Sequence, residues 1–263
     1  MKIFNSFKKG KKTATDPKSE KVATETQAET AAAGIKSENS GAETAQDARR
    51  VHNLIVLDES GSMRSIYHPA LTGVNETLQT IREAQKEHED QKHYVSLIAF
   101  DSGHYNRIYS NTAAEMAADI TADQYRPGGC TPLYDAMGRS ISELRPVVAK
   151  GDVVLVTIIT DGYENASQEY NGKAIKSLVE AMKAEGWIFT YIGANQDVEA
   201  VAASMSIDNH LSFDADETST RAMFAKENKS RKAFFNKVSC SLSFNDLAGN
   251  YFADDDEDKD IKA

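Results

Sequence analysis

The chain has 263 residues and a formal net charge of −10, and 40% of its residues are hydrophobic. This length fits one domain of about 190 residues with flanking segments better than two domains. The acidic balance argues against nucleic acid as the main partner, because phosphate binding needs clustered lysine and arginine.

The two ends of the chain differ from its middle in composition. Residues 1–48 are rich in Ala, Thr, Glu, Lys and Ser, and the other end carries an acidic run at 254–260. Neither end has periodic apolar residues, so neither offsets its chain entropy by burial. We predict a disordered N-terminal tether at 1–48, a folded domain at 49–247 and a disordered acidic tail at 248–263. A weak contact of the basic residues 1–9 with an anionic membrane is the alternative for the first segment.

Targeting and redox signals are sparse. No stretch approaches the roughly 20 apolar residues of a membrane-spanning helix, and no signal-peptide core follows the N-terminal lysines. Cys130 and Cys240 are the two cysteines, and they form neither a metal-binding spacing nor a disulfide framework. We expect a cytoplasmic protein without stable membrane insertion.

Apolar patterns predict strands that alternate with helices along the folded domain. Apolar runs typical of strands lie at 54–57, 94–100, 107–110, 153–160, 187–192 and 209–213. Helical periodicity lies at 69–87, 133–144, 175–186, 198–205 and within 218–238. This alternation indicates an α/β fold with a doubly wound, mostly parallel six-stranded sheet and helices on both faces. Ligands of such folds bind beyond the carboxyl ends of the strands.

The first strand ends in the turn Asp58-Glu59-Ser60-Gly61-Ser62. Alternate side chains of an extended backbone point the same way, so Asp58, Ser60 and Ser62 can converge. Small oxygen ligands at the end of a strand suit a hard cation. The alternative is that Ser and Gly make the turn while Asp58 caps the next helix.

Two further loops complete a recognisable pattern. Thr131 lies in the loop 127–132 before a predicted helix, and Asp161 follows the strand 153–160. With the D-x-S-x-S turn, these features resemble the von Willebrand factor type A (VWA) domain over about residues 51–240. The resemblance implies a Rossmann-like fold whose edge strand at 107–110 is antiparallel. It also implies a metal-ion-dependent adhesion site with the ligands Asp58, Ser60, Ser62, Thr131 and Asp161.

The resemblance also implies a function. Mg2+ is the expected ion, with Mn2+ or Ca2+ as alternatives, and an Asp or Glu of a protein partner would complete its shell. The chain would then be a non-enzymatic binding module. The stretch Thr131–Ala136 is most similar to stand-alone bacterial cytoplasmic VWA proteins of the tellurite-resistance and stress-associated kind.

Several alternatives remain at this point. Thr131 could be an N-cap before Pro132. The chain could be a structural assembly subunit whose metal only braces the loops. A Mg2+-dependent phosphatase-like hydrolase is disfavoured, because it needs a second Asp where Ser60 stands. The expected rim around the ion, which would select the partner, consists of Arg64, Tyr67, His68, Glu164 and Asn165.

Overall fold

A computed structural model describes residues 48–240, 246–247 and 249–252. They contain a six-stranded sheet in the order β3-β2-β1-β4-β5-β6. All neighbouring strands are parallel except β2 and β3. The predicted fold class, including the antiparallel edge strand, is therefore confirmed. The strands are β1 (Arg49–Asp58), β2 (Gln91–Phe100), β3 (Tyr105–Ala113), β4 (Val153–Thr160), β5 (Trp187–Ala194) and β6 (Asn209–Phe213).

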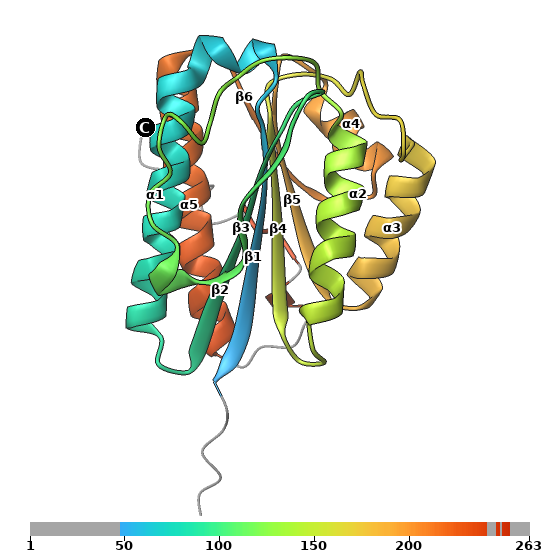
Figure 1. The fold of residues 1–263 in the computed structure, drawn as a ribbon. Helices are drawn as coiled ribbons and strands as arrows, with labels where there is room; N and C mark the ends of the chain where they lie inside the picture. The colour runs from blue at the N-terminus through green and yellow to red at the C-terminus, as the bar shows by residue number, and fades with distance from the viewer. Residues whose placement is uncertain (1–47, 241–245, 248, 253–263) are drawn as a thin grey trace, which may run out of the picture. The chain divides into compact units, whose positions relative to one another are not determined.

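Helices cover both faces of the sheet, with α1 and α5 on one face and α2 and α3 on the other (Figure 1). Among the described residues, none of the helices combines the length and the apolar character needed to cross a membrane. The helices are α1 (Tyr67–Glu87), α2 (Leu133–Leu144), α3 (Gly172–Ala184), α4 (Val198–Ser204) and α5 (Glu217–Ser239), with 3-10 turns at η1 (Gly61–Ile66), η2 (Ala114–Met116) and η3 (Arg145–Val147).

The central strand β1 supplies both cores. Ile55 and Leu57 pack in the core beneath α1 and α5, whereas Leu54 and Val56 pack in the core beneath α2 and α3. Both faces are covered, so the strand is apolar at successive positions rather than at alternate ones. β1 begins at Arg49, whereas the apolar run predicted a strand only from residue 54. The pattern misses the first half of β1 because this half contains polar residues that are buried with distant partners.

One of these partnerships joins three elements around a buried guanidinium. Arg231 of α5 is 0% exposed. It donates to Asn53 Oδ1 of β1 over 2.9 Å and to Thr157 Oγ1 of β4 over 2.8 Å. It also forms an ion pair with Glu227 at 2.7 Å. The Tyr251 hydroxyl donates to the same carboxylate over 3.1 Å. The polar groups of this core are thus connected to one another.

Tyr251 corrects the predicted boundary of the domain. Its ring is 5% exposed and lies 5.9 Å from the ring of Phe234, and its backbone N–H donates to Asn209 Oδ1 over 2.9 Å. The expectation that the chain makes no core contact after residue 247 is wrong for residue 251, because one buried aromatic produces no periodic pattern. The other residues predicted to be disordered, 1–47 and 253–263, lie outside the described part of the chain.

Replacing Tyr251 tests this contact. Tyr251→Ala should lower the free energy of unfolding by about 3–5 kcal/mol, since it removes a buried ring. Tyr251→Phe keeps the ring and should cost about 1 kcal/mol. Denaturant unfolding of the full chain measures both changes, with the exposed Tyr163→Ala as control. Equal stability of Tyr251→Ala and the wild type would show that the segment does not pack on α5.

Candidate metal site

The candidate site lies at the edge of the sheet where β1 and β4 end, at the top of Figure 1. The two strands are parallel neighbours. Their carboxyl ends therefore bring Asp58 and Asp161 to the same edge, as the sequence predicts. A third loop, residues 128–132, is hydrogen-bonded to the loop after β1 at this edge and leads into α2.

Four of the five predicted ligands form one hydrogen-bonded cluster. Asp58 Oδ1 accepts from the backbone N–H of Ser60 over 2.7 Å. Ser60 Oγ and Ser62 Oγ are 3.1 Å apart, and Ser62 Oγ donates to Asp161 Oδ1 over 2.6 Å. No side chain caps η1 or α1, so the alternative role of Asp58 as a helix cap is wrong.

Thr131, the fifth predicted ligand, lies beside this cluster. A Cβ placed on Gly162 would be 3.7 Å from Ser62 Oγ and 3.9 Å from Thr131 Oγ1, so both hydroxyls lie near one glycine. Asn165 fixes the Thr131 backbone: Thr131 N–H donates to Asn165 Oδ1 over 2.8 Å, and the Asn165 N–H donates to the Thr131 carbonyl over 3.1 Å. Helix α2 has Pro132 as its N-cap and no capping side chain. The alternative role of Thr131 as that cap is wrong.

The two carboxylates carry negative charge inside the protein. Asp58 is 0% exposed and Asp161 is 2% exposed. Neither forms an ion pair with a basic residue in the part of the chain that the structure describes. Burial raises the pKa of Asp58 to about 6, and the nearby charge of Asp161 adds to this increase. Burial also raises the pKa of Asp161, although the hydrogen bond from Ser62 opposes the change.

The available oxygens fit a hard divalent cation. Asp161 Oδ2 is buried without a hydrogen-bond partner among the described residues, and such an atom costs free energy unless a donor or cation meets it. Its neighbours are carboxylates and hydroxyls, the ligands that Mg2+ and Ca2+ take. The described residues include no group of three or more His, Cys, Asp or Glu that could hold a metal. A site here therefore depends on its hydroxyls.

Three supporting residues escaped the sequence analysis. Thr160 donates to Asp58 Oδ2 over 2.6 Å, and the buried Tyr125 hydroxyl donates to the Asp58 carbonyl over 3.0 Å. Glu59 is 4% exposed, and its carboxylate accepts from the backbone N–H of Arg126. One feature of the sequence indicates a role for Thr160 at the site, namely its position at the end of a predicted strand. Tyr125 and Glu59 act across many residues of sequence, and no local pattern marks them.

The loop before α2 is fixed against the loop after β1. Gly128 N–H donates to the Glu59 carbonyl over 2.8 Å, and Gly61 N–H donates to the Gly129 carbonyl over 3.1 Å. Gly129 has a φ of +65°, and a Cβ there would be 2.7 Å from Ser102 Oγ. Glycine is required at position 129 on both counts.

The predicted rim residues have two kinds of environment. Glu164 and Asn165 hold the loops together: Glu164 Oε2 accepts from Tyr134 N–H over 2.9 Å, and Asn165 fixes Thr131 as described above. Arg64 and His68 are exposed. Arg64 Nε donates to a neighbouring carbonyl, that of residue 127, over 2.9 Å. Asn165 is exposed as well, and selection of a partner by these residues stays a prediction.

The sheet order, the single antiparallel edge and the loop cluster define a class of α/β domain. The family model for the von Willebrand factor type A domain matches residues 54–232, more than half of the chain. The chain belongs to this family, whose domains are protein-interaction modules. A comparison with curated proteins found no match.

Solved structures agree on the fold. The D319A mutant of the PilB minor pilin from Streptococcus sanguinis aligns with a TM-score of 0.55 at 13% identity, over 76% of this chain and 65% of that one. The vWF domain of the type V pili tip protein Mfa5 from Porphyromonas gingivalis gives 0.50 at 10% identity, over 71% and 96%. The chain thus spans about two thirds of the pilin. At these identities the likeness concerns the fold alone.

Substitution of Asp58 tests the charge of the site in the metal-free protein. The native carboxyl has a pKa of about 6 instead of 3.8, so its ionisation opposes folding at neutral pH. In EDTA at pH 7.5, Asp58→Asn should raise the free energy of unfolding by about 2–3 kcal/mol. The gain should decline as the pH falls from about 6 to about 4, because the wild-type carboxyl then binds its proton.

Denaturant unfolding at several pH values measures this difference, and Asp119→Asn, an exposed carboxylate, is the control. A loss of stability in Asp58→Asn, or a gain that does not vary with pH, would contradict the assignment of uncompensated charge.

Proposed function

We propose that this chain is a non-enzymatic protein-binding module that holds Mg2+ and uses it to bind an Asp or Glu side chain of a partner. The observation that carries the proposal is the pair of buried carboxylates, Asp58 and Asp161, which have no cationic partner in the described part of the chain and leave Asp161 Oδ2 without a hydrogen bond. A divalent cation is the group that offsets such charge.

Each predicted ligand has a distinct part. Asp58 and Asp161 supply the negative charge, and three hydroxyls supply neutral oxygens, those of Ser60, Ser62 and Thr131. When bound, the ion supplies positive charge for a carboxylate from outside. Ser62 is exposed whereas Asp58 is buried, so the cluster has one side that faces solvent.

The binding role is favoured over a metal that only braces the loops. The three loops are already joined through their backbones, at Gly61 to Gly129, at Gly128 to Glu59 and at Asn165 to Thr131. Hydrogen bonds thus supply the bracing that the alternative assigns to a metal. The hydrolase alternative lacks its second acidic residue, since Ser60 occupies that position.

We also propose a bacterial cytoplasmic setting, in a stress-associated complex, on the strength of the sequence resemblance. Cys130 and Cys240 are both exposed and unpaired, which suits a reducing compartment.

Isothermal titration of the full chain tests the ion. We expect one Mg2+ per chain, with Mn2+ or Ca2+ also accepted. Asp58→Ala and Asp161→Ala should each weaken binding at least about tenfold, because hydroxyls do not replace the lost charge. Asp119→Asn, the exposed control used above, should bind like the wild type. Unchanged affinity in both alanine variants would exclude the site.

Thr131 tests whether the ion serves a partner. The probe is a capped peptide with one Asp, compared with its Asn counterpart in Mg2+ and in EDTA. Thr131→Ala should reduce Mg2+ affinity modestly, since water can take the vacant position, but should reduce Asp-peptide affinity at least about fivefold. Thr131→Ser keeps the hydroxyl, so its affinity for the Asp peptide should be close to that of the wild type. Asp-peptide binding that needs neither Mg2+ nor Thr131 would favour the bracing alternative.

A further inference from the structure

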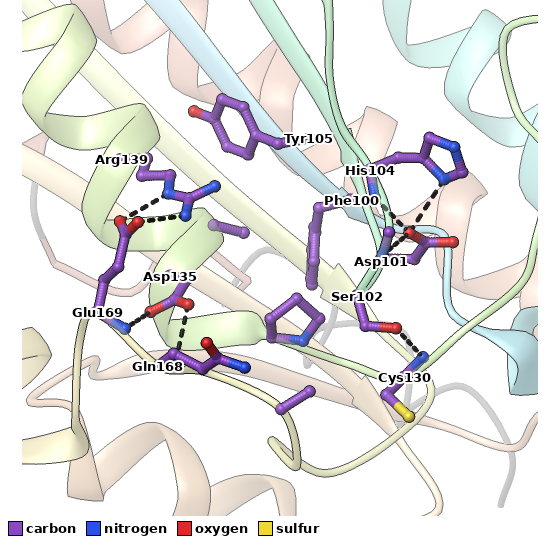
Figure 2. Close-up of a pocket in the computed structure, with 14 residues that line it drawn as sticks. Phe100, Asp101, Ser102, His104, Tyr105, Cys130, Asp135, Arg139, Gln168 and Glu169 are labelled. Carbon is purple, nitrogen blue, oxygen red and sulfur yellow. Dashed lines mark hydrogen bonds and ion pairs between the residues drawn. The ribbon is translucent and has the colours of Figure 1, made fainter.

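A cavity of about 390 Å3 adjoins the candidate metal site. Figure 2 shows it between the turn that joins β2 to β3 and the side of α2. Cys130 and Pro132 line it, and these are the two neighbours of Thr131 in the chain. We call this cavity the hairpin pocket. Its walls are formed by residues 100–105, by Cys130 and Pro132, by Asp135, Ala136 and Arg139 of α2, and by Ala166, Gln168 and Glu169.

The hairpin pocket contains more negative than positive charge. Its lining includes the carboxylates of Asp101, Asp135 and Glu169 against the guanidinium of Arg139 and the imidazole of His104. Arg139 is already engaged: it forms two hydrogen bonds with Glu169, at 2.8 and 2.5 Å, and lies 5.6 Å from the centre of the Tyr105 ring. The pair of Arg139 and Glu169 is therefore neutral, and two carboxylates remain.

Of these two, Asp135 already uses both of its carboxylate oxygens in hydrogen bonds within the protein. It is 7% exposed, and its oxygens accept from three backbone N–H groups at 2.8–2.9 Å, those of Gln168, Glu169 and Tyr170. Burial opposes its ionisation, but these hydrogen bonds outweigh burial and hold the pKa of Asp135 below its usual range. Its charge is thus present at neutral pH, although its oxygens are occupied.

Asp101 is the carboxylate that has one oxygen available to accept a hydrogen bond from a ligand. It is 7% exposed, and its Oδ1 accepts from the backbone N–H groups of Gly103 and His104, both over 2.6 Å. The same oxygen lies 3.2 Å from Nδ1 of the His104 ring (Figure 2). Within the described residues, Oδ2 has no hydrogen-bond partner; it lies beside Gly129, where an added Cβ would be 3.2 Å away. Oδ2 is not one of the fully enclosed unpartnered atoms of the described chain, so a ligand can reach it. A carboxylate oxygen of a mostly buried residue gains from a positively charged donor.

We propose that the hairpin pocket receives a lysine or arginine side chain of the partner whose carboxylate occupies the metal site. This inference rests on the proposed function and specifies its partner: an acidic residue with a basic residue close to it in sequence. Phe100 and Tyr105 also line the pocket, and such rings can cover the aliphatic stem of a basic side chain while its head reaches the carboxylate.

Matched sets of three peptides, one set for each register, test the inference on the full chain with Mg2+. Each peptide is capped and carries one Asp, with Lys, norleucine or Glu placed one, two or three positions to either side. Norleucine keeps the apolar stem of lysine and removes its charge. In at least one register, the Lys peptide should bind at least about fivefold more tightly than its norleucine counterpart, and the Glu peptide should be the weakest.

Asp101→Asn identifies the source of the preference. Asparagine keeps an oxygen that can accept from Gly103 and His104 but carries no charge. The Lys-to-norleucine affinity ratio should fall to near one in this variant. It should persist in Asp208→Asn, which removes an exposed carboxylate next to β6, at the opposite edge of the sheet from β3.

Equal affinities of the Lys and norleucine peptides in every register, a preference for Glu, no detectable binding, or a ratio unaffected by Asp101→Asn would each overturn the inference. The metal proposal is scored separately, by Mg2+ titration of the protein alone and by the Asp-to-Asn peptide comparison. The metal proposal can therefore stand while this inference fails, and a failure of the metal proposal is recognised by its own measurements.

Discussion

The fold has to keep two like charges buried at one edge of its sheet. Removing a carboxylate from water costs several kcal/mol, and a second carboxylate nearby adds to that cost. Asp58 is the last residue of β1 and Asp161 directly follows β4, and these are the two central strands, so both carboxylates lie at this edge. Every residue of β4 is buried, as is β1 from residue 51 onward. The apolar cores on both faces thus stabilise an edge that is unfavourable by itself.

Hydrogen bonds within the protein hold the loops around this edge. Backbone hydrogen bonds join the loop after β1 to the loop before α2, and Asn165 joins that loop to the one after β4. Loops held in this way lower the ordering cost of binding the proposed partner, which favours affinity. The loop at 128–132 borders both the candidate metal site and the hairpin pocket, so the distance between the two proposed subsites is set by a short piece of chain.

Much of this arrangement could be predicted from the sequence, and the exceptions share a physical cause. Apolar runs marked the strands, and β4 and β6 have the predicted bounds. Position relative to strand ends marked Asp58 and Asp161. The contacts of Tyr125 and Glu59 depend on which loops meet, which no local pattern encodes. The same holds for the early start of β1, where Asn53 is buried because Arg231 reaches it from α5. Tyr251 was missed because a single anchoring side chain has no period.

The buried Arg231 also constrains how the domain is made during translation. Its hydrogen-bond partners are Asn53 of β1, Thr157 of β4 and Glu227 of α5. The Tyr251 hydroxyl, from beyond α5, donates to the Glu227 carboxylate as well. These groups leave the ribosome in that order, and the guanidinium is fully partnered only when nearly all of the domain is available. Until then, the sheet face that α5 covers exposes polar groups meant for a buried interior. This face of the nascent chain is therefore completed late, and the domain is finished as a unit rather than strand by strand.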